Sequence, residues 1–352
     1  MARNFSPWAY WRLRLDATPP SASLPSALDA LERHREATRA ALDARLGPWP
    51  EAVPLAVETR DEEQCDGYRR VGIVFDSEAG MSVPAHLLVP DDRRAPGPAV
   101  LAIHGHGLDK DLVCGIDRGD PAARFAIDDN NGDYARQLAR RGFVVLAPDL
   151  RTFGERADHL LPVPPIADEV DDIVQHHFVC DYELVCAAMF GEQPVTHQVW
   201  DLRRALDVLS EHPLVDPHRL GVAGWSFGGM LALVLAAIDE RVRASVVSCF
   251  FSSWRRAHEL PWNMCGNQVV AGVLGALEHT DIAALVAPRV LCIESATDDD
   301  LFPVDAARAG VAQLRDAYST LDASADAIVH DVFAGSHGWH GTVAIDVLER
   351  AL

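Results

Sequence analysis

Leu220-Gly-Val-Ala-Gly-Trp-Ser-Phe-Gly-Gly-Met230 carries the pattern of a buried strand, a Gly-x-Ser-x-Gly turn and the start of an apolar helix. In a nucleophile elbow the serine lies on a sharp turn, so the residues two before and two after it must be small. Gly224 and Gly228 meet this requirement. The pattern therefore predicts Ser226 as a nucleophile. A helix beginning at Phe227 would direct its positive end and the Phe227 N–H at an oxyanion beside that serine.

Short apolar runs alternate with helical segments from Pro98 onward, which is typical of βαβ crossovers and a parallel sheet. Two earlier runs read as an antiparallel hairpin at the edge of that sheet. Strands are predicted at 68–75, 82–89, 99–103, 143–147, 220–223, 244–249, 290–294 and 328–333. Helices are predicted at 24–46, 133–141, 195–209, 227–238 and 305–317.

We expect two parts, a helical amino-terminal extension at 1–67 and one α/β domain at 68–352. Residues 151–194 and 250–280 are much longer than ordinary connections. Both follow the carboxyl ends of predicted parallel strands, where open α/β sheets place their ligand sites. They are therefore predicted to be insertions that cap the active site.

Composition excludes several classes of function. The chain has 352 residues, is 49% apolar and carries a formal charge of −21. Nucleic acid is not an expected partner, because no basic stripe is available to neutralise phosphates. No secretory signal or membrane span is visible, and the seven cysteines form no Cys-x-x-Cys pair. We therefore expect a cytoplasmic protein without a membrane partner; the oligomeric state stays open, and a homo-oligomer is compatible with the sequence.

A serine hydroxyl needs a base and an orienting carboxylate, which in this type of fold follow in the order serine, acid, histidine. The acid is expected just past the strand at 290–294, where Thr297-Asp-Asp-Asp-Leu-Phe-Pro303 offers three carboxylates. The base is expected past the last strand, where Gly335-Ser-His-Gly-Trp-His-Gly341 offers His337 and His340.

Together with His104-Gly-His-Gly107, these motifs resemble the serine α/β-hydrolases, in the branch that contains dienelactone hydrolases and acetyl xylan esterases. The resemblance covers roughly residues 70–352. It implies a mostly parallel, eight-stranded sheet flanked by helices, and hydrolysis of esters through an acyl-enzyme. The nucleophile of the dienelactone hydrolases is cysteine, whereas this chain has serine, which favours deacetylase or general esterase activity over lactone hydrolysis.

The resemblance also implies residue roles. The Asp-x-x-x-Pro spacing of the family favours Asp299 as the acid, with Asp298 as the alternative, and the position of the Gly-x-His loop favours His337 as the base. The same resemblance pairs the backbone N–H of His106 with that of Phe227 in the oxyanion hole. Tryptophans beside the motifs and in the presumed cap are predicted to line an apolar substrate pocket: Trp225, Trp254, Trp262 and Trp339.

The sequence thus predicts an enzyme that cleaves a small-molecule carboxylic ester with a Ser-His-Asp triad. No cofactor is expected, and no metal, since His104 and His106 have no evident third ligand nearby. A thioesterase or small peptidase of the same fold is an alternative. Another alternative is a non-catalytic ligand-binding protein on a hydrolase scaffold, although such proteins usually lose a triad residue.

Overall fold

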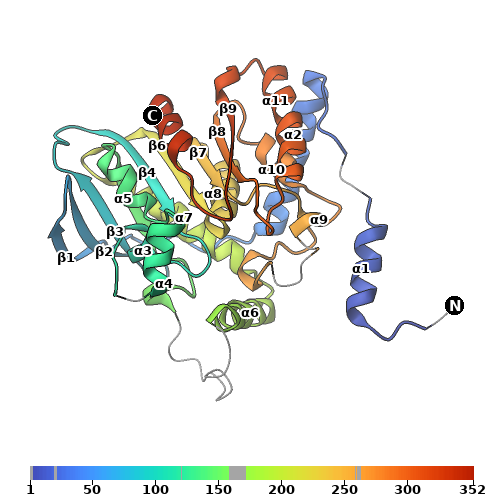
Figure 1. Cartoon of the computed structure of the whole chain (residues 1–352), viewed down its shortest axis with the longest axis horizontal. Coiled ribbons are helices and arrows are strands. Elements are labelled where there is room, and N and C mark those ends of the chain that lie inside the picture. Colours follow the sequence, from blue (N-terminus) through green and yellow to red (C-terminus); the bar gives the residue numbers. More distant parts are fainter. Residues whose placement is uncertain (1–2, 20–21, 120, 158–171, 258, 260–262) are drawn as a thin grey trace.

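The computed structural model describes residues 3–19, 22–119, 121–157, 172–257, 259 and 263–352. Its centre is one mixed sheet with the strand order β1-β2-β3-β5-β4-β6-β7-β8-β9 (Figure 1). β1, β2 and β3 pair antiparallel, as does β3 with β5, and every pairing from β5 to β9 is parallel. The strands are β1 Glu58–Gln64, β2 Tyr68–Glu78, β3 Met81–Pro90, β4 Gly97–Ile103, β5 Val144–Pro148, β6 Val215–Trp225, β7 Val242–Ser248, β8 Val290–Ala296 and β9 Ile328–Phe333.

The sheet has nine strands, one more than the eight predicted. All eight predicted strands are present, and the additional strand is β1, Glu-Thr-Arg-Asp-Glu-Glu-Gln. Each of its residues is exposed, because β1 lies at the sheet edge and pairs only with β2. A strand without an apolar face does not show the alternation of apolar and polar residues by which strands are predicted. β1 also lies inside the segment 1–67 that was expected to be helical.

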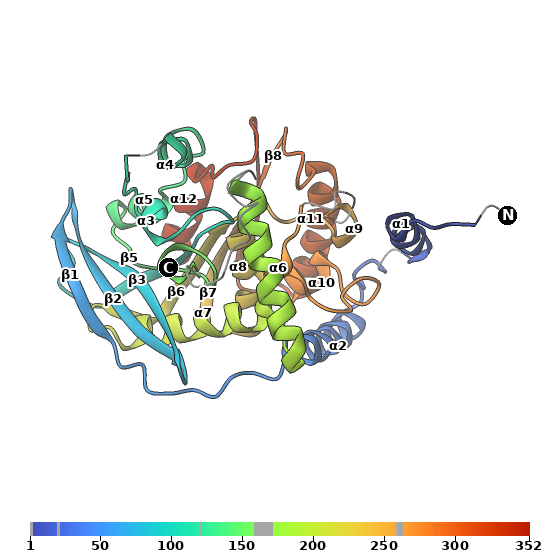
Figure 2. The ribbon, with the colours of Figure 1, turned by 90° about the horizontal axis from the view of Figure 1, so that it is seen from below.

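Helices cover both faces of the sheet, as Figure 2 shows from below. Along β4, alternate side chains enter two different cores: Ala99, Leu101 and Ile103 face one, and Val100 and Ala102 the other. A strand buried on both faces has a continuous apolar sequence, and this pattern predicts β4. The longer helices are α2 Leu28–Leu46, α5 Tyr134–Arg140, α6 Asp172–Phe190, α7 Pro194–Glu211, α8 Phe227–Ile238, α11 Val304–Thr320 and α12 Thr342–Ala351.

The shorter helical segments lie mainly in the connections. They are α3 Lys110–Val113, α4 Pro121–Arg124, η1 Phe125–Asp129, η2 Gly154–Arg156, α9 Trp254–Ala257, η4 Gly266–Gln268, α10 His279–Ala284 and η5 Ala325–Ala327. Within the described residues, none of the helices combines the length and apolarity that crossing a membrane requires.

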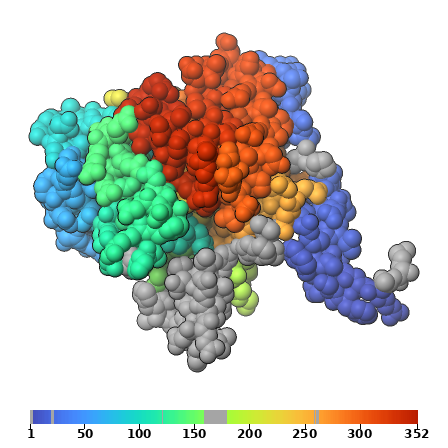
Figure 3. Space-filling model, viewed as in Figure 1, coloured from blue at the N-terminus to red at the C-terminus, as the bar shows by residue number. Residues whose placement is uncertain are grey.

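The amino terminus contributes two helices with different environments. α2 buries Leu31, Leu42 and Leu46 completely in the core. α1, Pro7–Ala17, extends from one side of the molecule (Figure 3). The helix is held mainly at its carboxyl end, where Leu15 is buried. The Leu15 carbonyl accepts a hydrogen bond from Arg255 Nη2 at 2.9 Å.

The two long insertions contact each other. α6 belongs to the first, and η4 belongs to the second. The Gly266 N–H donates to Asp181 Oδ1 at 2.7 Å, and a Cβ at Gly266 would lie only 2.3 Å from the Cys180 carbonyl oxygen. This close approach needs glycine, so α6 is fixed against the start of η4.

Candidate active site

Ser226 lies at the junction between β6 and α8, in a conformation that is rare for a residue with a side chain. Its φ is 58° and its ψ is −121°, and its N–H donates to the Ser248 carbonyl of the neighbouring strand β7 at 2.8 Å. Such strained residues cluster at functional sites, because the surrounding structure must hold them in place. The side chain is half-buried, while both of its neighbours, Trp225 and Phe227, are buried.

The two flanking glycines permit the turn. A Cβ at Gly224 would lie 2.1 Å from the Gly228 carbonyl oxygen, and a Cβ at Gly228 would lie 1.9 Å from the Ile103 carbonyl oxygen. These are backbone atoms that no rotamer change can move. The strand, the turn and the helix therefore pack at distances that exclude any side chain at either position.

The loop after β4 packs directly on the elbow. A Cβ at Gly105 would lie 2.9 Å from the Trp225 carbonyl oxygen and 3.4 Å from Ser226 Cβ. His104 holds the start of this loop: its Nδ1 lies 2.8 Å from the Gly105 carbonyl, and its Nε2 accepts the Leu150 N–H at 3.0 Å. Burial lowers the pKa of His104, which keeps the ring neutral. The contacts of His104 are therefore structural, and they hold the loop whose Gly105 packs against Ser226.

Asp299 and His337 are brought together by neighbouring strands. Asp299 Oδ2 lies 2.8 Å from His337 Nδ1, while Asp299 Oδ1 accepts the N–H groups of Leu301 and Phe302. The carboxylate is thus oriented by the backbone on one side and faces the imidazole with the other oxygen. The Asp299 side chain is 1% exposed and the His337 side chain 22% exposed.

The His337 ring also lies beside the elbow. Its centroid is 5.4 Å from that of Trp225, the residue before Ser226, and 5.9 Å from that of Phe302. The described contacts therefore place His337 between the elbow and the loop that carries Asp299.

The other candidates for acid and base have different surroundings. Asp298 and Asp300 are exposed, and the Asp298 side chain accepts only a 3.3 Å hydrogen bond from Thr297 among the contacts described. His340 contacts a different carboxylate. Its Nδ1 lies 2.6 Å from Asp331 Oδ2, and its ring stacks on Phe333.

Sequence reasoning missed Cys249, which follows β7. Its sulfur lies within 4.8 Å of the ligand atoms of Asp299 and His337 and donates to the Gly338 carbonyl at 3.2 Å. Burial, together with the charge of Asp299, raises the pKa of Cys249 to about 12. The thiol therefore stays protonated and fastens the histidine loop. No motif could have indicated this contact, because it joins segments 89 residues apart.

Three of the four tryptophans predicted to line a pocket lie within the described residues. Trp225 is buried, and its ring lies beside that of His337. Trp254 is 1% exposed and packs edge-on against His279, and Trp339 is 3% exposed and stacks on Tyr134 with ring centroids 4.5 Å apart. Trp254 and Trp339 thus pack in the core, and their contribution to a substrate pocket stays a prediction. Trp262 lies outside the described residues.

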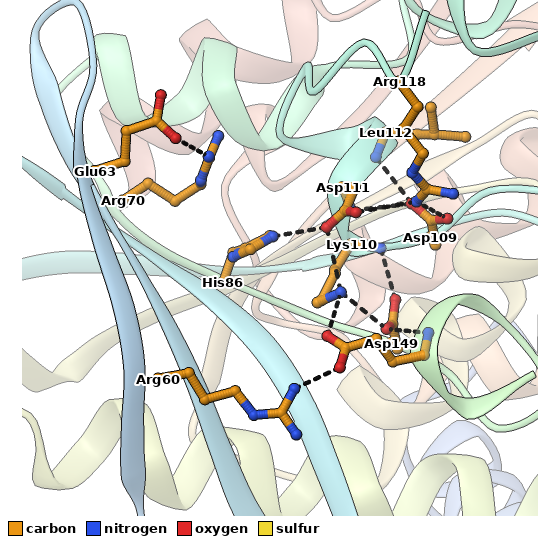
Figure 4. A network of polar contacts seen from close by, with 11 residues as sticks. Arg60, Glu63, Arg70, His86, Asp109, Lys110, Asp111, Leu112, Arg118 and Asp149 are labelled. Atoms are coloured by element: carbon orange, nitrogen blue, oxygen red, sulfur yellow. Dashed lines mark hydrogen bonds and ion pairs between the residues drawn. The ribbon is translucent and has the colours of Figure 1, made fainter. Parts of the chain in front are cut away.

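A buried charge network supports the connection after the His104–Gly107 loop (Figure 4). Lys110 Nζ lies 2.8 Å from Glu155, 3.2 Å from Asp111 and 3.3 Å from Asp149, whose side chain is fully buried. Burial alone would disfavour the ammonium, but the three carboxylates outweigh it and raise the pKa of Lys110. The ion pairs link α3 to the ends of β5 and η2, and so fix the carboxyl edge of the sheet.

One groove among the described residues lies away from the elbow. It has a volume of about 730 Å³ and is formed by α1 and residues 269–274, with Trp8 and Trp11 in its wall. Neither Ser226 nor His337 contributes to it. We therefore do not assign this groove to the elbow.

Comparisons with known proteins show which families and folds the chain is similar to. The model of the dienelactone hydrolase family matches residues 123–260. The Bacillus subtilis (strain 168) protein named "Putative hydrolase YtaP" is 27% identical over 205 residues, which is 58% of this chain and 60% of that protein, so the match spans less than two thirds of the relative.

Solved structures share the fold. A "putative acetyl xylan esterase" from Bacteroides fragilis NCTC 9343 superposes with a TM-score of 0.75 at 19% identity, covering 94% of this chain and 83% of that one. A glucuronoyl esterase from Solibacter usitatus gives a TM-score of 0.65 at 17% identity, with 96% and 98% covered. The predicted fold class and the predicted resemblance are confirmed: the chain has the α/β-hydrolase fold and is similar to the dienelactone hydrolase and acetyl xylan esterase branch of that superfamily.

Proposed function

We propose that the chain is a serine hydrolase that cleaves a carboxylic ester, of the esterase or deacetylase type, through an acyl-enzyme. The observation that carries this proposal is the 2.8 Å hydrogen bond between Asp299 and His337 beside the strained Ser226 turn. A histidine oriented by a buried carboxylate next to an elbow serine is the arrangement that activates a hydroxyl for acyl transfer.

The proposed reaction follows from this arrangement. With Nδ1–H donated to Asp299, His337 presents an unprotonated Nε2, which takes the Ser226 proton as Oγ attacks the ester carbonyl. The backbone N–H groups of Phe227 and His106 stabilise the oxyanion. Collapse of the tetrahedral intermediate breaks the bond to the alcohol, which leaves with the proton from His337. Water then hydrolyses the acyl-enzyme by the same steps, and the acid is released.

The charges near the site support a neutral ester as substrate. Arg151 and Arg156, the cations at the exit of β5, are both paired with buried Asp201, at 2.9 and 2.8 Å. Arg151 also pairs with Glu78. Cations committed to internal carboxylates are poor ligands for a substrate carboxylate, and the chain as a whole is acidic. Small acyl esters, such as the acetyl esters named for the Bacteroides fragilis protein, are therefore the first candidates.

We also propose a cytoplasmic location. All seven cysteines are free thiols, which is the usual state in reducing compartments.

The decisive experiment labels the protein with a fluorophosphonate probe. Wild-type protein should be labelled once, at Ser226, because only an activated serine attacks the phosphorus centre. Ser226→Ala should remain folded and unlabelled, and its turnover should fall on the order of 10⁴-fold or more. Ser253→Ala is a matched control that should label normally. A folded wild-type protein that is not labelled would instead favour a non-catalytic binding protein.

A second experiment identifies the leaving group. We expect p-nitrophenyl esters of increasing acyl length to show an optimum at short chains. Matched acyl thioester and p-nitroanilide substrates should be hydrolysed more slowly. Faster cleavage of the thioester or of the anilide would move the assignment to a thioesterase or a small peptidase.

A further inference from the structure

A histidine and two cysteines meet beside the oxyanion loop although they lie far apart in the sequence. His106 follows β4, Cys180 belongs to α6, and Cys265 immediately precedes η4. One nitrogen of His106 and the two sulfurs all lie within 4.8 Å of one another, and His106 Nε2 is 3.6 Å from Cys180 Sγ. Both cysteines are 1% exposed, while His106 is half-buried.

Polar groups surround this cluster, and one of them is held in a strained conformation. Thr152 has a φ of 73°, which is exceptional for a β-branched residue, and its Oγ1 lies 3.5 Å from Cys180 Sγ. Asn267 Nδ2 donates to Thr152 Oγ1 at 2.9 Å and lies 3.4 Å from the same sulfur. The other atom of this fully buried amide, Oδ1, has no hydrogen-bond partner among the described residues. Buried polar atoms usually have a hydrogen-bond partner, so the unpaired Oδ1 is consistent with a ligand at this position.

The pKa values of the two thiols are shifted in opposite directions. A hydrogen bond from Cys265, followed by contacts with His106 and Thr152, lowers the pKa of Cys180. The same shared hydrogen bond, together with burial, raises the pKa of Cys265. The two sulfurs therefore interact directly with each other as well as with the His106 ring. Two cysteine sulfurs and an imidazole are the ligand types that zinc prefers.

We propose that His106 Nε2, Cys180 Sγ and Cys265 Sγ bind a zinc ion. In a tetrahedral zinc site with the usual bond lengths, sulfur and nitrogen ligands lie roughly 3.5–3.8 Å apart. The 3.6 Å between Cys180 Sγ and His106 Nε2 falls in this interval, so the ligands need little movement to close around the ion. The fourth position borders Thr152 Oγ1 and Asn267, whose amide would present Oδ1 to the metal after a half-turn.

Such an ion would join three elements that no covalent bond connects. It would tie both insertions, through α6 and the residue before η4, to the loop that carries the His106 N–H. Its primary role is therefore structural. The proposal does not depend on the ester chemistry, because Ser226, Asp299 and His337 are not ligands.

Metal binding can be measured directly on the full chain, kept reduced and stripped with a chelator. We expect one equivalent of Co²⁺ to produce thiolate charge-transfer absorption and the visible bands of a tetrahedral ion, and Zn²⁺ to displace it. Zn²⁺ should raise the Tm. Cys180→Ser and Cys265→Ser should lose stoichiometric binding and the Tm increase. Cys186→Ser is the matched control, because it lies on the same helix, half-buried and outside the cluster, and should behave like wild type.

Three results would overturn the proposal: no binding of either metal by folded wild-type protein, binding that survives both serine variants, or a Cys180–Cys265 disulfide in protein isolated without reductant. If a serine variant does not fold, His106→Gln changes the third ligand from another element, and binding retained in that variant would also count against the site. Fluorophosphonate labelling of the same samples separates a failure of this proposal from a failure of the proposed esterase activity.

Discussion

Asp299 and His337 lie 38 residues apart and are joined by a 2.8 Å hydrogen bond, because β8 and β9 are parallel neighbours that end at the same edge of the sheet. The backbone continues this pairing beyond the strands: the Thr297 N–H donates to the Phe333 carbonyl, and the Asp298 N–H donates to the Gly335 carbonyl. The two loops therefore leave the sheet in register, and Asp299 rather than Asp298 is turned toward the imidazole.

Asp299→Asn should lower kcat for p-nitrophenyl acetate by about 10⁴-fold, because an amide in place of the carboxylate favours the wrong tautomer of His337. Asp298→Asn is the control and should stay close to wild type, since its side chain is exposed. Circular dichroism should show both variants folded. Equal losses of kcat in the two variants would contradict the assignment of Asp299, and not Asp298, as the acid of the triad.

Gly228→Ala should destabilise the protein by about 3 kcal/mol or more, because its Cβ would overlap the Ile103 carbonyl oxygen at 1.9 Å and the backbone must shift. Fluorophosphonate labelling of Ser226 should be lost with it. Gly338→Ala is the control, because a Cβ at Gly338 would lie 3.5 Å from its nearest neighbour, the Asn130 carbonyl oxygen. This variant should unfold at nearly the same denaturant concentration as the wild type. A stable, labelled Gly228→Ala protein would contradict the packing described for the elbow.

Lys110→Met should cost about 3 kcal/mol or more of unfolding free energy, because it leaves the buried Asp149 carboxylate without its cation. The comparison is Arg124→Met, which removes an ion pair to Asp117 in which both side chains are about half exposed. Such exposed pairs contribute only about 0–1 kcal/mol. Urea denaturation measures both changes, and similar values for the two variants would show that the Lys110 network is not desolvated as described.

Glu294 predicts a pH dependence of stability. Burial raises the pKa of this carboxyl, at the end of β8, to about 7 from an ordinary value of 4.5. The folded protein therefore binds more protons than the unfolded chain between these values, and the contribution of Glu294 to stability falls as the pH rises through that interval. At pH 8, Glu294→Gln should be more stable than wild type by up to about 3 kcal/mol.

The same comparison near pH 4.5 should show little difference, because the carboxyl is then protonated in the folded protein and resembles the amide. Glu294 Oε1 accepts the Gly341 N–H at 2.8 Å, and glutamine can keep that bond. The exposed Glu51→Gln serves as control and should show no pH-dependent difference. If the wild-type protein instead gains stability relative to Glu294→Gln between pH 5 and 8, the pH dependence has the opposite sign. That result would refute a raised pKa for Glu294.

The sequence by itself determined the central parallel strands and the elbow, because both are local patterns. β4 and the second part of β6, from Leu220 to Trp225, are apolar runs buried on both faces. The glycines at 224 and 228 follow from the space around one turn. β1 could not be predicted in the same way, since a polar edge strand is held by its backbone pairing with β2 and has no apolar face.

Only the tertiary structure decided which side chains meet. It paired His337 with Asp299 and His340 with Asp331, and it buried Trp254 and Trp339 in the core. It also assembled His106, Cys180 and Cys265 from three distant segments. The physical reason is that local periodicity records which face of an element is buried. The partner across that face depends on strand order and register, which no local pattern contains.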